Sequence, residues 1–510
     1  METPRAQREL APGRQVPGHR PNVVVFVIDT LRLDFTGAGT APGRTTVLGR
    51  ELRSRHPRAT VLEAATAAAT STVPSVKGLM TSRPPSTWGF TGAGSDPPPE
   101  GVPTLASSFL RAGYDTAAVT GNPLIQGGAF ESGFTYFWAA GGLHFFQGSL
   151  LLQDLLALRD YWQTLELVSR FRIHKLDGES VLRVADRWLS ERAPDRPFFL
   201  YLHIVEPHWP YDAAGPDPPI ELPGPPLDHV DLLRLPKGFP RNRIIRGTAL
   251  LQELEQRYET GVRRAGDLVG RTLSMLENAG TADDTLVIVL ADHGEEFFEH
   301  DGFSHGHDVF EEQTAVPFVL LWPPNWPEWR PVSESSAPVS LLDLWPTLAD
   351  LVDLPTPEAG LSGRSLVPLL AGEEDPSASE PVMSEAFYGP FWRMSFRQGR
   401  FKVRLTFNTE VSPLDTAAVE VFDLVADPGE ESPIRPGDDE LRTSSPVRAQ
   451  RRRAAGAIGR RTVCPEPPLT TPSSSSFGRS ATSSKLPVAA ARSSTLLGFS
   501  RPTLERPATA

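Results

Sequence analysis

The sequence predicts an α/β protein with a mainly parallel central sheet sandwiched by helices. Two observations support this: short, wholly apolar strand-like runs recur through residues 21–351, and helical stretches separate them. Parallel strands buried on both faces have this continuous apolar character, and each needs a crossover to reach the next. A change in the residue pattern near residue 382 predicts, in addition, a small C-terminal α+β subdomain.

The elements of the main domain are predicted in order along the chain. The strand candidates are Val23–Ile28, Asp115–Thr120, Phe198–Ile204, Thr285–Ala291 and Phe318–Leu321. The helix candidates are residues 104–113, 178–192 and 251–280. Alternation of the two kinds of element indicates strand–helix–strand units.

Domain boundaries are predicted from composition. We expect a flexible N-terminus at 1–20, the main α/β domain at 21–375 and an antiparallel-sheet subdomain at 376–440. In the last of these, "FWRMSFRQGRFKVRLTF" and "AAVEVFDL" predict strands joined by a glycine turn. Residues 441–510 are rich in Arg, Ser, Pro and Ala without periodicity, and we expect a disordered basic tail.

The net charge is divided unevenly between body and tail. Residues 441–510 carry a net +10, and the first 440 residues carry −22. The acidic body argues against nucleic-acid binding by the folded part. Three explanations fit the composition of the tail. It is a solvated extension, a basic arm that contacts a polyanion, or the product of a reading frame that shifts near Leu441.

Other features exclude whole classes of protein. The single cysteine, Cys464, excludes an intramolecular disulfide and a multi-cysteine metal site. The longest apolar runs are far too short to span a membrane. Because no apolar segment of signal-peptide length follows the charged N-terminus, we expect a cytoplasmic protein. The oligomeric state is left open.

Acidic and imidazole side chains follow two of the predicted strands. Asp29 comes directly after Val23–Ile28, and Asp292 and His293 come directly after Thr285–Ala291. In open α/β sheets ligands bind beyond the carboxyl ends of the strands. This donor set therefore predicts a site for one divalent cation, Ca²⁺, Mg²⁺, Mn²⁺ or Zn²⁺. A helix N-cap is the alternative role for a lone strand-end aspartate.

A third stretch, "AATAAATSTVPSVKGLMTS" at residues 64–82, resembles a turn that leads into a helix with Pro74 in its first turn. Backbone N–H groups at a helix start attract an anion. A hydroxyl group there, in contact with a cation, can lose its proton and become a nucleophile. An ordinary Ser/Thr-rich helix cap explains the same pattern.

With these residues in view, the chain resembles the sulfatase family of the alkaline phosphatase superfamily, from about Asn22 to Pro428. The motifs that carry the resemblance occur in the order of the family: "PNVVVFVIDTLRLDF", "TSTVPSVKGLMTS", "TLASSFLRAGYDTAAVTGNP", "PFFLYLHIVEPHWPYD", "VIVLADHGEEFFEHDGFSHGHDVFEE", "VSLLDLWPTLADL", "GRSLVPLL" and "EVFDLVADPGE". The resemblance implies an alkaline-phosphatase-like fold and a metal-dependent ester hydrolase.

The resemblance implies roles for individual residues. Asp29, Asp292 and His293 match the metal ligands, and Thr30 stands where many sulfatases have a second aspartate. Thr72 matches the nucleophile. Two further histidines match residues that meet the leaving group or the transferred group, namely His208 in "EPHWPY" and His305 in "FSHGH".

Two more residues are weaker candidates. Lys77, one position after the place of the family's arginine, is a candidate for substrate binding, although an exposed structural lysine explains it equally well. Glu206, two residues before His208, is the candidate ligand for a second metal, which we do not expect.

Departures from the family pattern concern the nucleophile. Sulfatases need a Cys or Ser that is oxidised to formylglycine, with an arginine four positions on, whereas this chain has Thr72 and Val76. A secondary alcohol cannot become that aldehyde, and Ser71 is one place out of register with Pro74. We therefore predict hydrolysis of phosphate mono- or diesters through Thr72. The alternatives are a sulfuric ester hydrolase (a sulfatase) and a non-catalytic binding relative.

The substrate is expected to be a small-molecule or glycan-type ester. Its identity depends on loops around residues 86–102, 138–165 and 213–245, whose shapes the sequence does not reveal. The apolar stretch 141–165 shields a pocket, forms a dimer contact or is an ordinary packed helix.

Overall fold

A computed structural model of the chain describes residues 20–37, 56, 58–88, 97–139, 177–209, 211, 249–326, 331–373, 380–408 and 418–434. The apolar stretch 141–165, most of the substrate loops and the tail 441–510 lie outside the described residues. The predicted boundaries of the N-terminus, the domains and the tail therefore stay predictions. No helix in the described ranges has the length and apolarity needed to cross a membrane.

The central sheet has eight strands and is mostly parallel, as predicted. Its order is β12-β2-β11-β7-β1-β6-β4-β5, with β1 at Asn22–Ile28 between β7 and β6. β11 is antiparallel to both of its neighbours, whereas the other pairs are parallel. The other strands are β2 at Ala59–Leu62, β4 at Asp115–Thr120, β5 at Tyr136–Ala139, β6 at Phe198–Ile204, β7 at Thr285–Ala291, β11 at Phe318–Leu321 and β12 at Glu334–Ser335.

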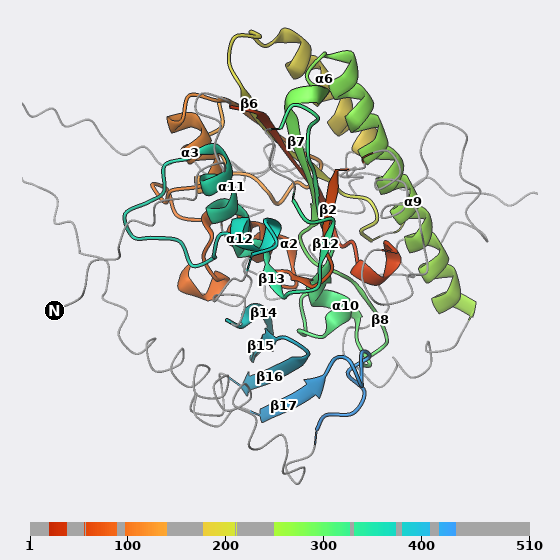
Figure 1. The fold of residues 1–510 in the computed structure, drawn as a ribbon. Helices are drawn as coiled ribbons and strands as arrows, with labels where there is room; N and C mark the ends of the chain where they lie inside the picture. The colour runs from red at the N-terminus through yellow and green to blue at the C-terminus, as the bar shows by residue number, and fades with distance from the viewer. Residues whose placement is uncertain are drawn as a thin grey trace, which may run out of the picture. The chain divides into compact units, whose positions relative to one another are not determined.

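Helices cover the sheet on its two faces (Figure 1). α6 and α9 lie on one side, and α2, α3 and α11 lie on the other. The predicted helices are confirmed to within three residues at each end. The helices are α2 at Thr72–Thr81, α3 at Leu105–Arg111, α6 at Gly178–Glu191, α9 at Ala249–Asn278, α10 at Glu311–Thr314, α11 at Leu344–Val352 and α12 at Val367–Leu370.

Short elements complete the main domain. A three-stranded sheet, β10-β3-β13, joins Ala315–Val316, Ala65–Thr66 and Val339–Ser340, and a two-stranded one joins β8 at Glu296–Phe297 to β9 at Phe303–Ser304. The short 3-10 helices are Leu33–Phe35, Pro85–Trp88, Gly128–Phe130, Ala282–Asp284 and Leu341–Asp343.

Local sequence explains where the helices begin. α3 starts with a capping box, in which Thr104 accepts a hydrogen bond from the Ser107 amide at 3.1 Å and the Thr104 amide donates to the Ser107 hydroxyl at 2.9 Å. Asp177 caps α6 by accepting from the Ser180 amide at 2.9 Å. All seven residues of β1 are buried, which explains its unbroken apolar run.

The small C-terminal sheet is antiparallel, as predicted, in the order β14-β15-β16-β17. Its strands are β14 at Val382–Tyr388, β15 at Phe391–Gln398, β16 at Phe401–Asn408 and β17 at Ala418–Asp423. It has a core of its own, made by Trp392, Met394, Phe396, Val403, Leu405, Phe407 and Val421.

Buried ion pairs join this sheet to the segment 296–314 of the main domain. Lys402 on β16 lies 2.9 Å from Glu311 and 3.1 Å from Glu430. Burial opposes the charge of Glu311, but Lys402 and Arg397 lower the pKa of its carboxyl to about 2. The Lys402–Glu311 contact is therefore ionic across the whole physiological pH range.

His300 belongs to the same network and predicts a pH-dependent stability. Burial works against its charge, but the hydrogen bond to Glu312 at 2.8 Å and the Glu312 charge raise the pKa of His300 to about 9. A raised folded-state pKa stabilises the protein fully below the unfolded value of about 6.5, and this contribution disappears as the pH rises through about 9.

We expect the free energy of unfolding to fall by about 1 kcal/mol between pH 7 and 9.5 because of His300, after discounting for its partial exposure. Urea unfolding of the wild type and of His300→Gln at both pH values measures this contribution. If the free energy of unfolding falls equally in the two proteins, His300 is not the source of the pH dependence.

Candidate active site

Acidic and imidazole side chains meet at the carboxyl ends of β1, β6 and β7, where the sequence predicts a site. Asp29 follows β1, Asp292 and His293 follow β7, and all three are fully buried. Because Ile28 pairs with Ala291 in register, the residues that follow them emerge side by side. The predicted convergence of Asp29, Asp292 and His293 is therefore present in the structure.

Thr72 lies in the same place. Its hydroxyl oxygen is 3.4 Å from Asp29 Oδ1 and 3.2 Å from His293 Nε2. It is the first residue of α2, and all ten residues of that helix are buried. Ser75, one turn on, donates a hydrogen bond to the backbone carbonyl of Asp292 at 2.6 Å, which ties the helix start to the end of β7.

His203 and Asn122 are site residues that the sequence reasoning missed. His203 is the sixth residue of β6, and its Nε2 lies 4.0 Å from Asp29 Oδ2 and 3.9 Å from Asp292 Oδ2. Asn122 follows β4 and donates to Asp29 Oδ2 at 2.8 Å. The sequence signal for His203 is a histidine inside an otherwise apolar, buried strand. The signal for Asn122 is its position just after the end of β4, where residues that bind ligands lie in open α/β sheets.

Asp29, His203 and Asp292 fit a divalent cation. Among the described residues they form the one group of three or more acidic and imidazole side chains whose ligand atoms all lie within 4.8 Å of one another. Asp292 Oδ2 and His203 Nε2 are buried and have no hydrogen-bond partner within the described ranges. Burial raises the pKa of Asp292 to about 7 and lowers that of His203 to about 3. Such groups are normally found paired or bound to a metal.

His293 remains a candidate for the same ion. Its Nε2 is 3.7 Å from Asp29 Oδ1 and 3.6 Å from Asp292 Oδ2. Its Nδ1 lies 2.9 Å from the carbonyl oxygen of Gly294, an acceptor only, so Nδ1 carries the proton and Nε2 is free to accept one or to bind a cation.

His305 and His208 extend the site in a row of imidazole rings. The ring centroid of His305 is 4.4 Å from that of His293 and 5.0 Å from that of His208. Nδ1 of His305 lies 2.9 Å from the buried Glu295 carboxylate, and Nδ1 of His208 lies 2.6 Å from the Trp209 carbonyl. Each ring is therefore held through Nδ1.

Lys77 and Glu206 are the two weaker candidates. Lys77 is buried on α2 five residues after Thr72, which places it about 140° round the helix from Thr72. Glu206 accepts a hydrogen bond from the Gly178 amide at 2.8 Å, at the start of α6. Glu206 is not a member of the Asp29, His203 and Asp292 group.

Close packing fixes the backbone beside Asp292 and His293. The Gly294 amide donates to the Gln313 carbonyl at 2.9 Å, and a Cβ added at Gly294 would lie 2.0 Å from the Glu312 carbonyl oxygen. Only glycine permits this approach. The segment after β7 is thereby fixed against α10.

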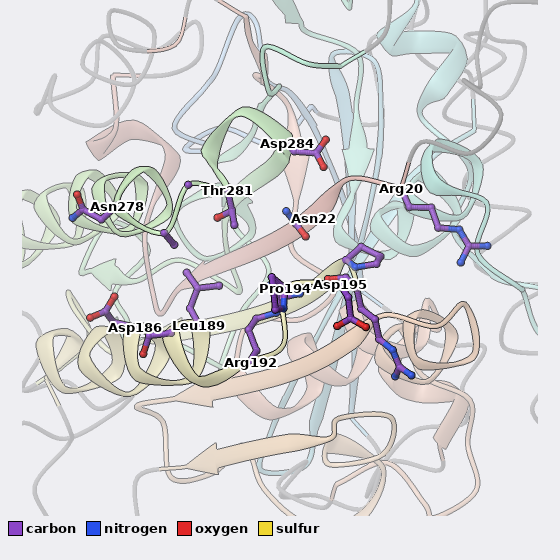
Figure 2. Close-up of a pocket in the computed structure, with 15 residues that line it drawn as sticks. Arg20, Asn22, Asp186, Leu189, Arg192, Pro194, Asp195, Asn278, Thr281 and Asp284 are labelled. Atoms are coloured by element: carbon purple, nitrogen blue, oxygen red, sulfur yellow. Dashed lines mark hydrogen bonds between the residues drawn. The ribbon is translucent and has the colours of Figure 1, made fainter.

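A separate hollow of about 750 Å³ lies at the opposite edge of the sheet, beside the amino ends of β1, β6 and β7 (Figure 2). Its lining mixes the cations Arg20, Arg192 and Arg196 with the anions Asp186, Asp195 and Asp284. The two charge signs balance, so the lining indicates no particular ligand, and the hollow is not part of the candidate site.

Comparisons with known proteins agree with the fold and with the family that the sequence resembles. The sulfatase family model matches residues 21–354. Arylsulfatase K of Xenopus laevis is 27% identical over 290 residues, which cover 51% of this chain and 52% of that protein. N-sulphoglucosamine sulphohydrolase of Homo sapiens is 32% identical over 221 residues, which cover 38% of this chain and 41% of that protein.

Among solved structures, phosphonate monoester hydrolase of Agrobacterium radiobacter has the same fold. Its TM-score is 0.61 at 18% identity, and the match covers 87% of this chain and 96% of that one. The chain spans about half the length, or less, of the two curated relatives named above.

The mostly parallel, helix-covered sheet defines the class as proteins of alkaline-phosphatase-like α/β fold. Within it, the chain belongs to the sulfatase family. The two curated relatives are a sulfatase and a sulphohydrolase by name, whereas the sequence analysis predicts a phosphate ester for this chain.

Proposed function

We propose that the chain hydrolyses sulfuric or phosphoric esters with Thr72 as the nucleophile. The observation that carries the proposal is the position of the Thr72 hydroxyl at a helix start, 3.2 Å from His293 Nε2 and 3.4 Å from Asp29 Oδ1. A hydroxyl becomes a useful nucleophile when a base and a cation are both within reach.

In this proposal Asp29, Asp292 and His203 would hold one divalent cation, so His203 has the ligand role that the sequence analysis predicts for His293. The bound ion would lower the pKa of the neighbouring hydroxyl and offset the negative charge of the transferred group. Asn122, which donates to Asp29 Oδ2, holds that carboxylate in position.

The protein groups then act in two steps. The Thr72 oxygen attacks the sulfur or phosphorus atom, its proton passes to His293 Nε2, and the ester oxygen leaves with a proton from His305 or His208. Water then attacks the covalent Thr72 ester and releases sulfate or phosphate, which restores the threonine hydroxyl.

Two ester classes are each supported by a different observation. The family and its named relatives support a sulfuric ester, and glycan-type substrates are consistent with the human relative's name. Thr72 supports a phosphoric ester, since a threonine cannot be oxidised to the formylglycine aldehyde that sulfatases use.

The test is turnover of p-nitrophenyl sulfate, p-nitrophenyl phosphate and bis-p-nitrophenyl phosphate by the metal-loaded protein. We expect at least one ester to be hydrolysed, and the ratio of kcat/KM values to identify the class. If the metal-loaded protein hydrolyses none of the three, the non-catalytic binding relative becomes the better description.

A further inference from the structure

The small C-terminal sheet contacts both loops that deliver the proposed reacting groups. One loop, residues 68–71, leads directly into Thr72. The other, residues 303–311, carries His305. The two loops also meet each other, since a Cβ added at Gly306 would lie 3.4 Å from Ser71 Cβ.

The edge strand β14 holds the first loop through its backbone. The Thr70 amide donates to the Glu385 carbonyl at 3.2 Å, and the Glu385 amide donates to the Ala68 carbonyl at 3.2 Å. The Glu385 side chain is fully buried and accepts from the Ser86 amide at 2.7 Å, just beyond the end of α2. This one residue therefore has contacts before and after the helix that starts with Thr72.

The strands β15 and β16 hold the second loop through arginines. Arg404 forms a bidentate ion pair with Asp308, in which both N···O distances are 2.7 Å. Arg393 donates to the His307 carbonyl at 2.6 Å and lies 3.2 Å from Asp308 Oδ2. Burial opposes ionisation of Asp308, but the Arg404 hydrogen bond and charge lower the pKa of the carboxyl, so the pair is ionic at neutral pH.

Strand register places these anchors close together on the sheet. Arg404 pairs with Ser395, which pairs with Ser384, while Arg393 pairs with Ala386. Glu385 lies between Ser384 and Ala386, so the three anchors fall on three consecutive rungs. Arg393 and Ser395 share a face of β15, and so Arg393 and Arg404 point to the same side.

We propose that the small sheet sets the separation between Thr72 and His305, and that Arg404 is a positioning residue which acts through His305. This inference rests on the proposed function, because it assigns reacting roles to both residues. A hydrogen-bonded strand edge and a planar arginine fork are rigid connections, and a displacement of about 1 Å at a reacting group is enough to lower a rate about 100-fold.

The experiment is a double-mutant cycle of Arg404→Met and His305→Ala, assayed for kcat on the p-nitrophenyl ester that the wild type hydrolyses best. We expect Arg404→Met to lower kcat about tenfold or more in the wild type and less than about twofold in His305→Ala, with KM nearly unchanged. Equal losses in both backgrounds would show a general structural effect and overturn the proposal.

Two further variants keep the test decisive. Arg400 pairs with Asp423 on the same sheet but contacts neither loop, so Arg400→Met is the matched control and should keep the wild-type kcat. Arg404→Lys keeps the positive charge but removes the planar guanidinium group that contacts both oxygens of Asp308. This variant tests the proposal if Arg404→Met does not fold.

For Arg404→Lys a loss of kcat that depends on His305 supports the proposal, and an unchanged kcat overturns it. A wild type that hydrolyses no ester would instead contradict the proposed function itself, and this inference would fail with it.

Discussion

Thr72→Ala is expected to lower kcat by at least about 1,000-fold while the protein remains folded. The substitution removes the hydroxyl oxygen that lies 3.4 Å from Asp29 Oδ1 and 3.2 Å from His293 Nε2. It also removes little volume from a helix that is held by its other buried residues. Steady-state kinetics with the best p-nitrophenyl ester, together with thermal unfolding, measure the two effects separately.

Ser71 provides the matched control. It also carries a hydroxyl, but it lies one residue before α2 and is out of register with Pro74. Ser71→Ala should keep kcat within about threefold of the wild type, and Thr72→Ser should retain more activity than Thr72→Ala. Full activity in Thr72→Ala, or loss of activity in Ser71→Ala alone, would contradict the assignment of the nucleophile.

Asp292→Asn is expected to raise the Kd for the divalent cation at least about 100-fold and to abolish turnover at micromolar metal. The variant removes the charge from one of the two carboxylates in the Asp29, His203 and Asp292 group. Isothermal titration calorimetry with Ca²⁺, Mg²⁺, Mn²⁺ and Zn²⁺ measures the Kd directly, without relying on activity.

Thermal unfolding gives an independent measurement of the same site. A cation at about 100 times its Kd should stabilise the wild type by about 2.7 kcal/mol, and the Tm should rise accordingly. Asp292→Asn should show no such rise. An equal rise in both proteins would place the cation elsewhere.

The two buried histidines provide a comparison within the metal site. If His203 is the third ligand and His293 the base, His203→Asn should weaken the metal by about 10-fold to 100-fold, and His293→Asn should lower kcat with a much smaller change in Kd. The reverse result would restore the ligand set Asp29, Asp292 and His293 that the sequence predicts.

Much of the fold follows from local sequence. β1 and β7 are almost wholly apolar runs because both of their faces are covered, and this burial is what makes them recognisable. Asp29, Asp292 and His293 could be placed together because parallel strands deliver their carboxyl ends to one edge. The start of α2 at Thr72, with Pro74 in its first turn, was predictable from the helix preference for proline there.

The parts that were missed depend on contacts distant in sequence. Nothing local to Phe318–Leu321 fixes its direction, and only pairing with β2 and β7 makes β11 antiparallel. His203 lies within a strand rather than after it, so the strand-end rule does not reach it. The contacts of Glu385 and Arg404 with the two site loops join segments that are separated by roughly a hundred to three hundred residues.

The central claim is that the Thr72 oxygen forms a covalent ester during turnover. Acid quenching of the metal-loaded protein during hydrolysis, followed by peptide mass spectrometry, tests this most directly. The account predicts one sulfuryl or phosphoryl group on Thr72 and none in Thr72→Ala, with the accurate mass identifying which group is transferred. An adduct on Ser71 or on a histidine, or active turnover with Thr72 unmodified at every quench time, would contradict it.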